Sequence, residues 1–326
     1  MKRRVLLKYA AAFALLPIPL RSLAQAARVP VVGILAPHVP GVPLTDAFVA
    51  KLAELGHVDG RTIRLERRMI DGGREAFAAA AAELVKLRVD VLFAASTAST
   101  DPATKATKTI PVVFETFSDP VANGLVKSLS HPGGNVTGVA GVEAQLAPKR
   151  LALIKEAVPR AVRVAVLRNP QNLNSASVGA ELDRAAKRLS LKLVYVNVQR
   201  AGELEAAFIA MVRKHRADVL LLLTDPLFST ERGQIIELAA KVHIPAIYPF
   251  SGMAAGGGLM VYGPDQLAMY RDAAVYVDKI LKGAKPGSLP VAQPTQFNLA
   301  INAGTAAALG LTLPQALLVR AETVIP

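Results

Sequence analysis

Short apolar runs rich in β-branched residues alternate along the chain with longer stretches in which apolar residues recur every three or four positions. Runs of the first kind are typical of parallel strands buried on both faces, and stretches of the second kind are typical of amphipathic helices. The pattern predicts two series of strands: Val31–Leu35, Ile63–Arg67, Asp90–Ala94, Pro111–Phe114 and Val136–Val139, then Arg163–Leu167, Lys192–Val196, Asp218–Leu223, Ile244–Ile247 and Leu259–Tyr262.

Helices are predicted between these strands, at Ala47–Leu55, Glu75–Leu87, Pro148–Val158, Glu181–Leu189, Glu203–His215, Glu231–Val242 and Gln266–Leu281. Alternation of strands and helices favours right-handed βαβ units in doubly wound parallel sheets. The two series meet near Gly138–Gln145. We therefore expect an α/β fold of two doubly wound lobes. Because ligands in such sheets bind at the carboxyl ends of the strands, a ligand is expected in a cleft between the lobes.

The first 26 residues have the pattern of a signal peptide. A basic start at residues 2–8 precedes an apolar run at 9–16, and Ala24-Gln25-Ala26 matches the A-x-A site of signal peptidase. Arg3-Arg4, followed by apolar residues and Lys8, also resembles the twin-arginine signal of proteins exported in the folded state. An ordinary Sec signal explains the segment equally well. Either reading predicts an exported mature protein that begins near Ala27 and is soluble.

The composition excludes several kinds of site. A chain of 326 residues with 52% hydrophobic content has ample apolar material for two cores. It has no Cys, so disulfides, thiolate metal sites, a Cys nucleophile and a lipid-bearing Cys are excluded. The five His residues are isolated, Gly133-Gly134-Asn135 lacks the Lys-Ser/Thr of a phosphate loop, and no G-x-S-x-G motif occurs. We expect no metal, no cofactor and no catalysis.

The net charge of +13 raises the question of a nucleic-acid partner. Five basic residues and no acids lie in residues 1–26, which leaves +8 on the remainder of the chain. The remaining basic residues are scattered, and no aromatic residues alternate with them to stack on bases. Solvated surface is therefore the favoured interpretation, and no nucleic-acid partner is expected.

Several motifs together resemble the ABC-transporter substrate-binding protein family, which is related to the tryptophan- and tyrosine-binding receptors. They cover nearly all of the predicted mature chain: Glu54-Leu-Gly56 with Asp59-Gly60, Thr109–Phe114, Ser118–Val121, Gly124–Leu129, His131–Gly138, Arg163–Leu167 with Asn169-Pro170, Leu289–Val291, Gln293–Thr295 with Phe297, Ala306–Leu309, Gly310–Pro314 and Ala321–Ile325.

This resemblance implies the type I periplasmic-binding-protein fold, in which two lobes are joined by a three-segment hinge. On that basis residues 27–141 and 264–288 are expected to form the first lobe. Residues 142–263 and 289–326 are expected to form the second lobe.

The resemblance also implies a function. The expected protein is a monomeric, periplasmic receptor that is not lipid-anchored. It binds a small polar solute, an amino acid or a small carboxylate, and delivers it to an ABC permease in the inner membrane. A solute-sensing module for a membrane partner and a doubly wound α/β hydrolase are the alternatives, and the solute's identity is left open.

Polar residues after the first-lobe strands are candidates for the ligand site. Ser96 and Thr97 follow the strand Asp90–Ala94, where hydroxyls and a helix N-terminus can hold a ligand carboxylate or simply cap the helix. After Pro111–Phe114, Phe117 is a candidate apolar wall. Asp119 either accepts from a ligand ammonium or caps a helix beginning at Val121.

Residues after the second-lobe strands form the other half of the candidate site. Asn169 and Asp225 follow two of these strands, and Asp225 is the preferred partner for a ligand amine, with a helix cap as the alternative. Tyr248, Phe250 and Ser251 follow Ile244–Ile247 and are expected to complete the opposite wall.

Overall fold

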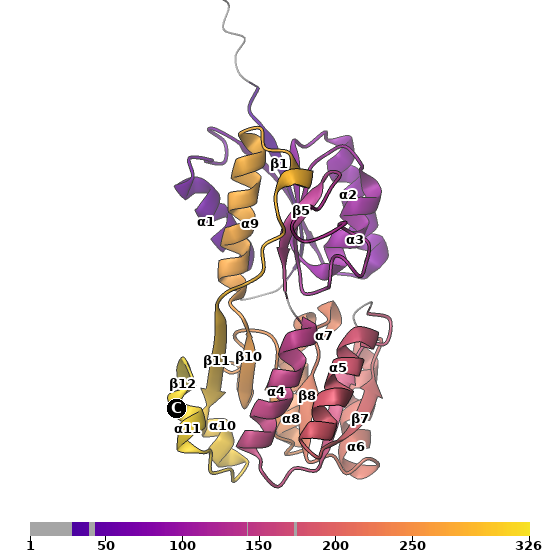
Figure 1. Cartoon of the computed structure of the whole chain (residues 1–326), viewed down its shortest axis with the longest axis vertical. Coiled ribbons are helices and arrows are strands. Elements are labelled where there is room, and N and C mark those ends of the chain that lie inside the picture. Colours follow the sequence, from indigo (N-terminus) through magenta and orange to yellow (C-terminus); the bar gives the residue numbers. More distant parts are fainter. Residues whose placement is uncertain (1–27, 39–42, 142, 173–174) are drawn as a thin grey trace, which may run out of the picture.

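The computed structural model describes residues 28–38, 43–141, 143–172 and 175–326 and contains two α/β lobes stacked along its long axis (Figure 1). The predicted signal peptide, residues 1–26, lies outside the described residues. Each lobe is built around one sheet, and the strands of the two sheets do not mix.

Lobe one is a parallel sheet with helices on both faces. The strand order is β2-β1-β3-β4-β5, with β1 at Val31–Pro37, β2 at Arg64–Ile70, β3 at Val91–Ala94, β4 at Val112–Thr116 and β5 at Val136–Ala140. One face packs against α1 (Leu44–Glu54) and α9 (Gln266–Leu281). The other face packs against α2 (Arg74–Lys86) and α3 (Thr97–Ala106). Both faces of the sheet are therefore apolar, as the continuous hydrophobic runs predicted.

Lobe two is a larger sheet of order β12-β11-β10-β9-β8-β6-β7, in which only the β10–β11 pair is antiparallel among the described strands. Its strands are β6 (Arg163–Arg168), β7 (Lys192–Asn197), β8 (Val219–Leu222), β9 (Ala246–Tyr248), β10 (Met260–Pro264), β11 (Phe297–Asn302) and β12 (Thr323–Ile325). Its helices are α4 (Glu143–Ala157), α5 (Ser175–Arg188), α6 (Leu204–Arg213), α7 (Pro226–Thr230), α8 (Arg232–Lys241), α10 (Ala303–Ala308) and α11 (Gln315–Val319), with short 3₁₀ turns at Ala201–Glu203 and Pro286–Ser288.

The chain passes between the lobes three times: from β5 to α4, from β10 to α9, and in the segment before β11. The last two passages touch, because the Asp265 amide donates to the Gln296 carbonyl at 3.2 Å. Two limits differ by a few residues from those expected. Pro264 pairs with Phe297 in the sheet of lobe two. Residues 289–292 stay on lobe one, where Val291 joins the apolar core and the Ala292 amide donates to the Gly138 carbonyl at 2.9 Å.

Most predicted elements form within a few residues of their expected limits, but the helix expected to begin at Val121 does not form. Residues 120–124 are turns. The Asp119 carboxylate accepts from the amides of Val121 at 2.9 Å and Ala122 at 3.0 Å. The Asp-Pro pair therefore starts a capped turn that does not continue as a helix, because Gly124 follows with a positive φ of 68°.

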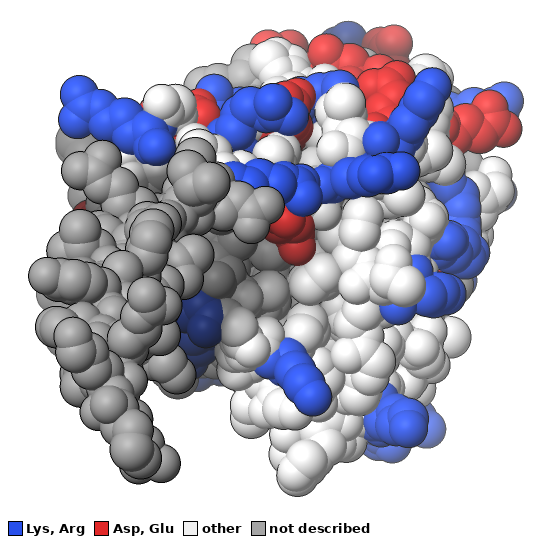
Figure 2. Space-filling model, turned by 90° about the horizontal axis from the view of Figure 1, so that it is seen from above, with Lys and Arg blue, Asp and Glu red and all other residues white. Residues whose placement is uncertain are grey.

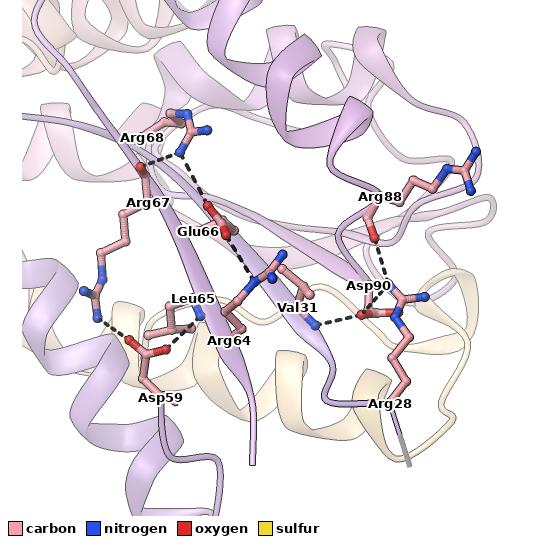
Figure 3. Close-up of polar contacts among 10 residues, drawn as sticks. All are labelled: Arg28, Val31, Asp59, Arg64, Leu65, Glu66, Arg67, Arg68, Arg88 and Asp90. Atoms are coloured by element: carbon pink, nitrogen blue, oxygen red, sulfur yellow. Dashed lines mark hydrogen bonds and ion pairs between the residues drawn. The ribbon is translucent and has the colours of Figure 1, made fainter. Parts of the chain in front are cut away.

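Basic residues are spread over the end of lobe one that faces away from lobe two. Seen from that end, Lys and Arg side chains cross the surface with Asp and Glu side chains among them (Figure 2). On the edge strand β2, Glu66 pairs with Arg64 at 3.1 Å and with Arg68 at 3.8 Å, while Arg67 reaches Asp59 at 3.5 Å (Figure 3). These exposed pairs surround the edge strand with charge, which disfavours pairing with another chain.

Candidate functional site

A cavity of about 50 Å³ lies between the lobes, at the carboxyl ends of strands from both sheets. Lobe one lines it with Pro37, Leu44, Ala95, Ser96, Thr97, Glu115, Phe117, Gln266 and Tyr270, and lobe two lines it with Asn172, Thr224, Asp225, Pro226, Ser229 and Phe250. We call this the interlobe cavity. A wider region of about 520 Å³ adjoins it toward α2 and shares Thr97 and Asp225.

The turn after β3 presents the N-terminus of α3 to the interlobe cavity. Ser96 is the N-cap, and its hydroxyl oxygen accepts from the Ser99 amide at 3.1 Å. The Thr97 hydroxyl lies 2.9 Å from that of Thr116 and accepts from the Phe117 amide at 3.2 Å. The amides of Thr97 and Ala98 belong to the first helical turn, whose N–H groups have no partner within the helix. The turn thus keeps donors on the cavity side for an anionic group.

Glu115, near the end of β4, is the least satisfied polar residue of the site. The residue is 2% exposed and lines the interlobe cavity. Its Oε1 has no hydrogen-bond partner among the described residues. Burial alone raises the pKa of Glu115 to about 8, because removal from water penalises the ionised carboxylate. A carboxyl in this position needs a donor that the described residues do not provide.

Asp225, ahead of α7, is buried but well satisfied. One carboxylate oxygen accepts from the Leu227 amide at 3.0 Å and from Asn169 at 3.4 Å, and the other accepts from Asn172 at 2.9 Å. Burial raises the pKa of Asp225, and the hydrogen bonds from these amide groups partly offset the rise. Asp225 therefore acts as the helix cap of lobe two, with its charge held by its own lobe.

Aromatic and polar contacts join the two walls of the cavity. The rings of Phe117 in lobe one and Phe250 in lobe two meet edge to face, with centroids 6.4 Å apart and planes at 83°. The Ser251 hydroxyl donates to Gln266 at 3.5 Å, from a loop of lobe two to the first turn of α9. These contacts hold the lobes together around the cavity.

The structure brings most of the predicted residues together. Five of them line the interlobe cavity: Ser96, Thr97, Phe117, Asp225 and Phe250. Asn169 lines the adjoining wider region and supports Asp225. Three lie elsewhere: Asp119 is exposed and caps its turn, Tyr248 belongs to the core of lobe two, and Ser251 contacts the cavity only through Gln266.

Sequence reasoning missed Glu115, Gln266, Tyr270 and Asn172. Glu115 had a signal, since an acid directly after the apolar run Val112–Phe114 sits on a strand that must be buried on both faces. Gln266 and Tyr270 had no local signal, because α9 reaches lobe one only through the passage from β10. The Tyr270 hydroxyl donates to the Ala95 carbonyl at 2.6 Å, so its proton is already used within lobe one.

A buried ion pair connects the hinge to the lobe-two half of the site. The side chains of Glu143 and Arg150, both on α4, are 2% and 0% exposed and pair through two contacts of 2.8 and 2.6 Å. Arg150 also donates to the Tyr262 carbonyl at 2.7 Å, two residues before the end of β10. Glu143 accepts from the Thr224 amide at 3.4 Å, next to Asp225. The ion pair therefore links the β5–α4 passage, the β10–α9 passage and the turn that contains Asp225.

Within the described ranges no three His, Cys, Asp or Glu side chains are grouped so that they could hold a metal ion. Likewise, no helix in that part of the chain has the length and apolar content needed to cross a membrane.

Comparison with known proteins gives consistent matches. Residues 43–325 match the family model described as ABC transporter substrate binding protein. The chain is 30% identical over 264 residues to a tyrosine-binding protein of Clostridioides difficile (strain R20291), covering 81% of this chain and 75% of that one.

Two solved structures share the fold. An ABC domain from Streptococcus pneumonia in complex with L-Trp is 25% identical, with a TM-score of 0.83 over 91% of this chain and 99% of that one. A ligand-free, open substrate-binding protein with adhesive properties from Clostridium difficile is 28% identical, with a TM-score of 0.64 over the same shares. The chain superposes better on the complex than on the open protein, although its identity to the open protein is no lower.

Proposed function

The chain belongs to the family of ABC transporter substrate-binding proteins, and from that premise we propose that it binds an amino acid between its lobes and delivers it to an ABC permease in the inner membrane. The predicted family and the α/β two-lobe fold are confirmed. The family consists of solute-binding proteins, so the expectation that the chain is not an enzyme is confirmed as well.

The observation that carries the proposal is the interlobe cavity with complementary polar groups on an apolar background. Together with the adjoining wider region of about 520 Å³, the cavity offers the space that a small ligand requires. The turn at Ser96 and Thr97 offers hydroxyls and a helix N-terminus to a carboxylate, and Phe117 and Phe250 offer apolar contact to a side chain. Such a site combines the chemistry that a zwitterion with an apolar side chain requires.

The names of the related proteins support the same class of ligand. One relative is a tyrosine-binding protein, and one structural neighbour holds L-Trp. The better superposition on the L-Trp complex supports a closed arrangement of the lobes in this chain. Closure around a ligand is a hinge motion, and the ligand shifts it only through its greater affinity for the closed form.

Localisation and partner follow from the sequence and the family. Residues 1–26 have the pattern of an export signal, which supports a periplasmic site of action, and the absence of Cys supports a protein without a lipid anchor. A monomeric receptor that presents its closed form to a permease is consistent with substrate-binding proteins of ABC transporters.

The test is a ligand screen on the purified mature protein, with the twenty amino acids and a set of small carboxylates. We expect the melting temperature to rise with one or a few amino acids, because a ligand at about 100 times its Kd stabilises the folded state by about 2.7 kcal/mol. Calorimetric titration should give one site per chain. A response to small carboxylates alone, or to no compound in the screen, would contradict amino-acid binding.

A further inference from the structure

Glu115 is buried beside the interlobe cavity, and its Oε1 receives no hydrogen bond from the described residues. The hydroxyl groups near it are occupied elsewhere: that of Tyr270 donates to Ala95, and that of Thr97 contacts Thr116 and the Phe117 amide. None of the described residues that line the interlobe cavity is Lys, Arg or His. The stretches 39–42, 142 and 173–174 contain no basic residue in the sequence. Arg74 lines only the wider outer region, where it pairs with Asp101.

The other acid of the cavity does not share this condition. Asp225 receives hydrogen bonds on both oxygens from Asn169, Asn172 and the Leu227 amide, all of which belong to lobe two. Its partners therefore remain with it whether the lobes are apart or together. Glu115 differs, because it lines a cavity whose opposite wall is formed by lobe two.

Burying a carboxyl without a partner is unfavourable, and the cost is removed when a donor of opposite charge is buried with it. Resting on the proposed amino-acid receptor function, we propose that Glu115 makes closure conditional on a ligand ammonium group: the empty lobes are held apart by the cost of enclosing Glu115, and the ammonium group binds to it. Compounds that lack this group then fail to close the lobes, even when they match the ligand in shape.

Binding of an ammonium group by Glu115 should depend on pH. Apart from Glu115, the titratable groups that line the cavity are Tyr270 of α9 and Asp225 ahead of α7, and neither carries positive charge; α3 contributes only Ser96 and Thr97. Burial raises the pKa of Glu115 to about 8 in the closed, empty arrangement. Protonation therefore favours empty closure, whereas binding of an ammonium group requires the ionised carboxylate. The affinity for an amino acid should fall as Glu115 becomes protonated.

The experiment compares the wild-type protein with Glu115→Gln, which keeps the size of the side chain and removes its charge. Asp119→Asn is the matched control, since Asp119 is an exposed acid just after the same strand, β4. The probes are L-tyrosine, L-tryptophan and L-leucine with their deamino analogues, 3-(4-hydroxyphenyl)propanoate, indole-3-propanoate and 4-methylpentanoate. Binding is measured by calorimetry from about pH 4 to pH 9, and closure by small-angle X-ray scattering.

The wild-type protein and Asp119→Asn should bind an amino acid at least about 30-fold more tightly than its deamino analogue, the lower end expected for a buried charge pair. In Glu115→Gln this preference should fall to less than about tenfold. The empty Glu115→Gln protein should scatter as the compact form at every pH, whereas the empty wild-type protein should become compact only as the pH falls.

Two results would overturn the inference and leave the proposed function standing: an unchanged amino-acid affinity in Glu115→Gln, or tight binding of the deamino analogue by the wild-type protein. A wild-type protein that binds no amino acid contradicts the proposed function itself. The pH dependence of wild-type binding is a second, independent measurement, so the inference stays testable even if Glu115→Gln does not fold. An affinity that does not fall between about pH 7 and pH 4, where the carboxylate of the open form takes up its proton, overturns it.

Discussion

The two lobes each bring a buried acid to the same cavity, and they surround it differently. Lobe two provides three hydrogen-bond donors to the Asp225 carboxylate, so these partners are in place as soon as that lobe folds. Lobe one leaves Oε1 of Glu115 without a partner among the described residues. Satisfying a polar group from within one lobe makes that half of the site a rigid scaffold. A polar group without a partner, such as Glu115, makes the lobe-one half of the site sensitive to the charge of the ligand in the cavity.

The largest expected effect comes from breaking the satisfied network of lobe two at its buried end. Glu143→Ala should lower the free energy of unfolding by about 3–5 kcal/mol, because Arg150 would stay buried without its partner. Urea unfolding followed by circular dichroism measures this. The double variant Glu143→Ala/Arg150→Met should recover most of the loss. Glu156→Ala, which removes an exposed pair with Arg320, should cost no more than about 1 kcal/mol. A loss for Glu143→Ala equal to this control would contradict the prediction.

A smaller effect should appear when the bare acid of lobe one is titrated without ligand. The folded pKa of Glu115, about 8, lies above its ordinary value of 4.5, so the folded protein holds a proton that the unfolded chain releases. The contribution of Glu115 to the free energy of unfolding should therefore be fully present below about pH 4.5 and fall by roughly 1–4 kcal/mol as the pH rises to 8, less where the lobes open. Denaturant unfolding across this range should show the slope in the wild-type protein and a reduced slope in Glu115→Gln. Parallel curves for the two proteins would contradict the predicted shift.

The smallest effect is expected from Asp225, the buried acid of lobe two. Asp225→Ala removes the cap of α7 and should lower the free energy of unfolding by about 1–2 kcal/mol. Because the charge of Asp225 is already met by its own lobe, the affinity for an amino acid should change by less than about tenfold in calorimetric titration. An affinity loss as large as that of Glu115→Gln would mean that both acids hold the ligand.

The fold was predictable because its signals are local or periodic. The run Val219–Leu222 can only be a strand buried on both faces, and the helix predicted at Gln266–Leu281 matches α9 in both limits. The strand β11 and the turns after Asp119 were not predicted. The strand β11 pairs antiparallel with β10 although α9 and the loop after it lie between the two strands in the chain. The turns after Asp119 begin with an Asp-Pro pair typical of a helix start, but Gly124 ends the turn.

The site was predictable only in part. Residues that follow a strand directly, such as Ser96 and Asp225, could be placed at the cavity because parallel strands end at one edge of a sheet. Whether such a residue binds a ligand or caps a helix depends on neighbours distant in sequence: Asn169 and Asn172 lie more than fifty residues before Asp225. Tyr270 and Gln266 reach the cavity from α9, whose place on lobe one followed from the family resemblance and not from the pattern of α9 itself.

The placement of α9 also bears on how this protein can be assembled and divided. Phe48 and Phe93 of lobe one stack at 4.1 Å, and Tyr270 packs edge-on against Phe93 at 5.5 Å. A fragment that ends with β5 would therefore expose the apolar surface that α9 covers in the full chain. The first half of the molecule cannot mature until the ribosome has made most of the second. Any chimaera built with a relative must exchange residues 28–141 together with α9, or leave both parents with an unfinished core.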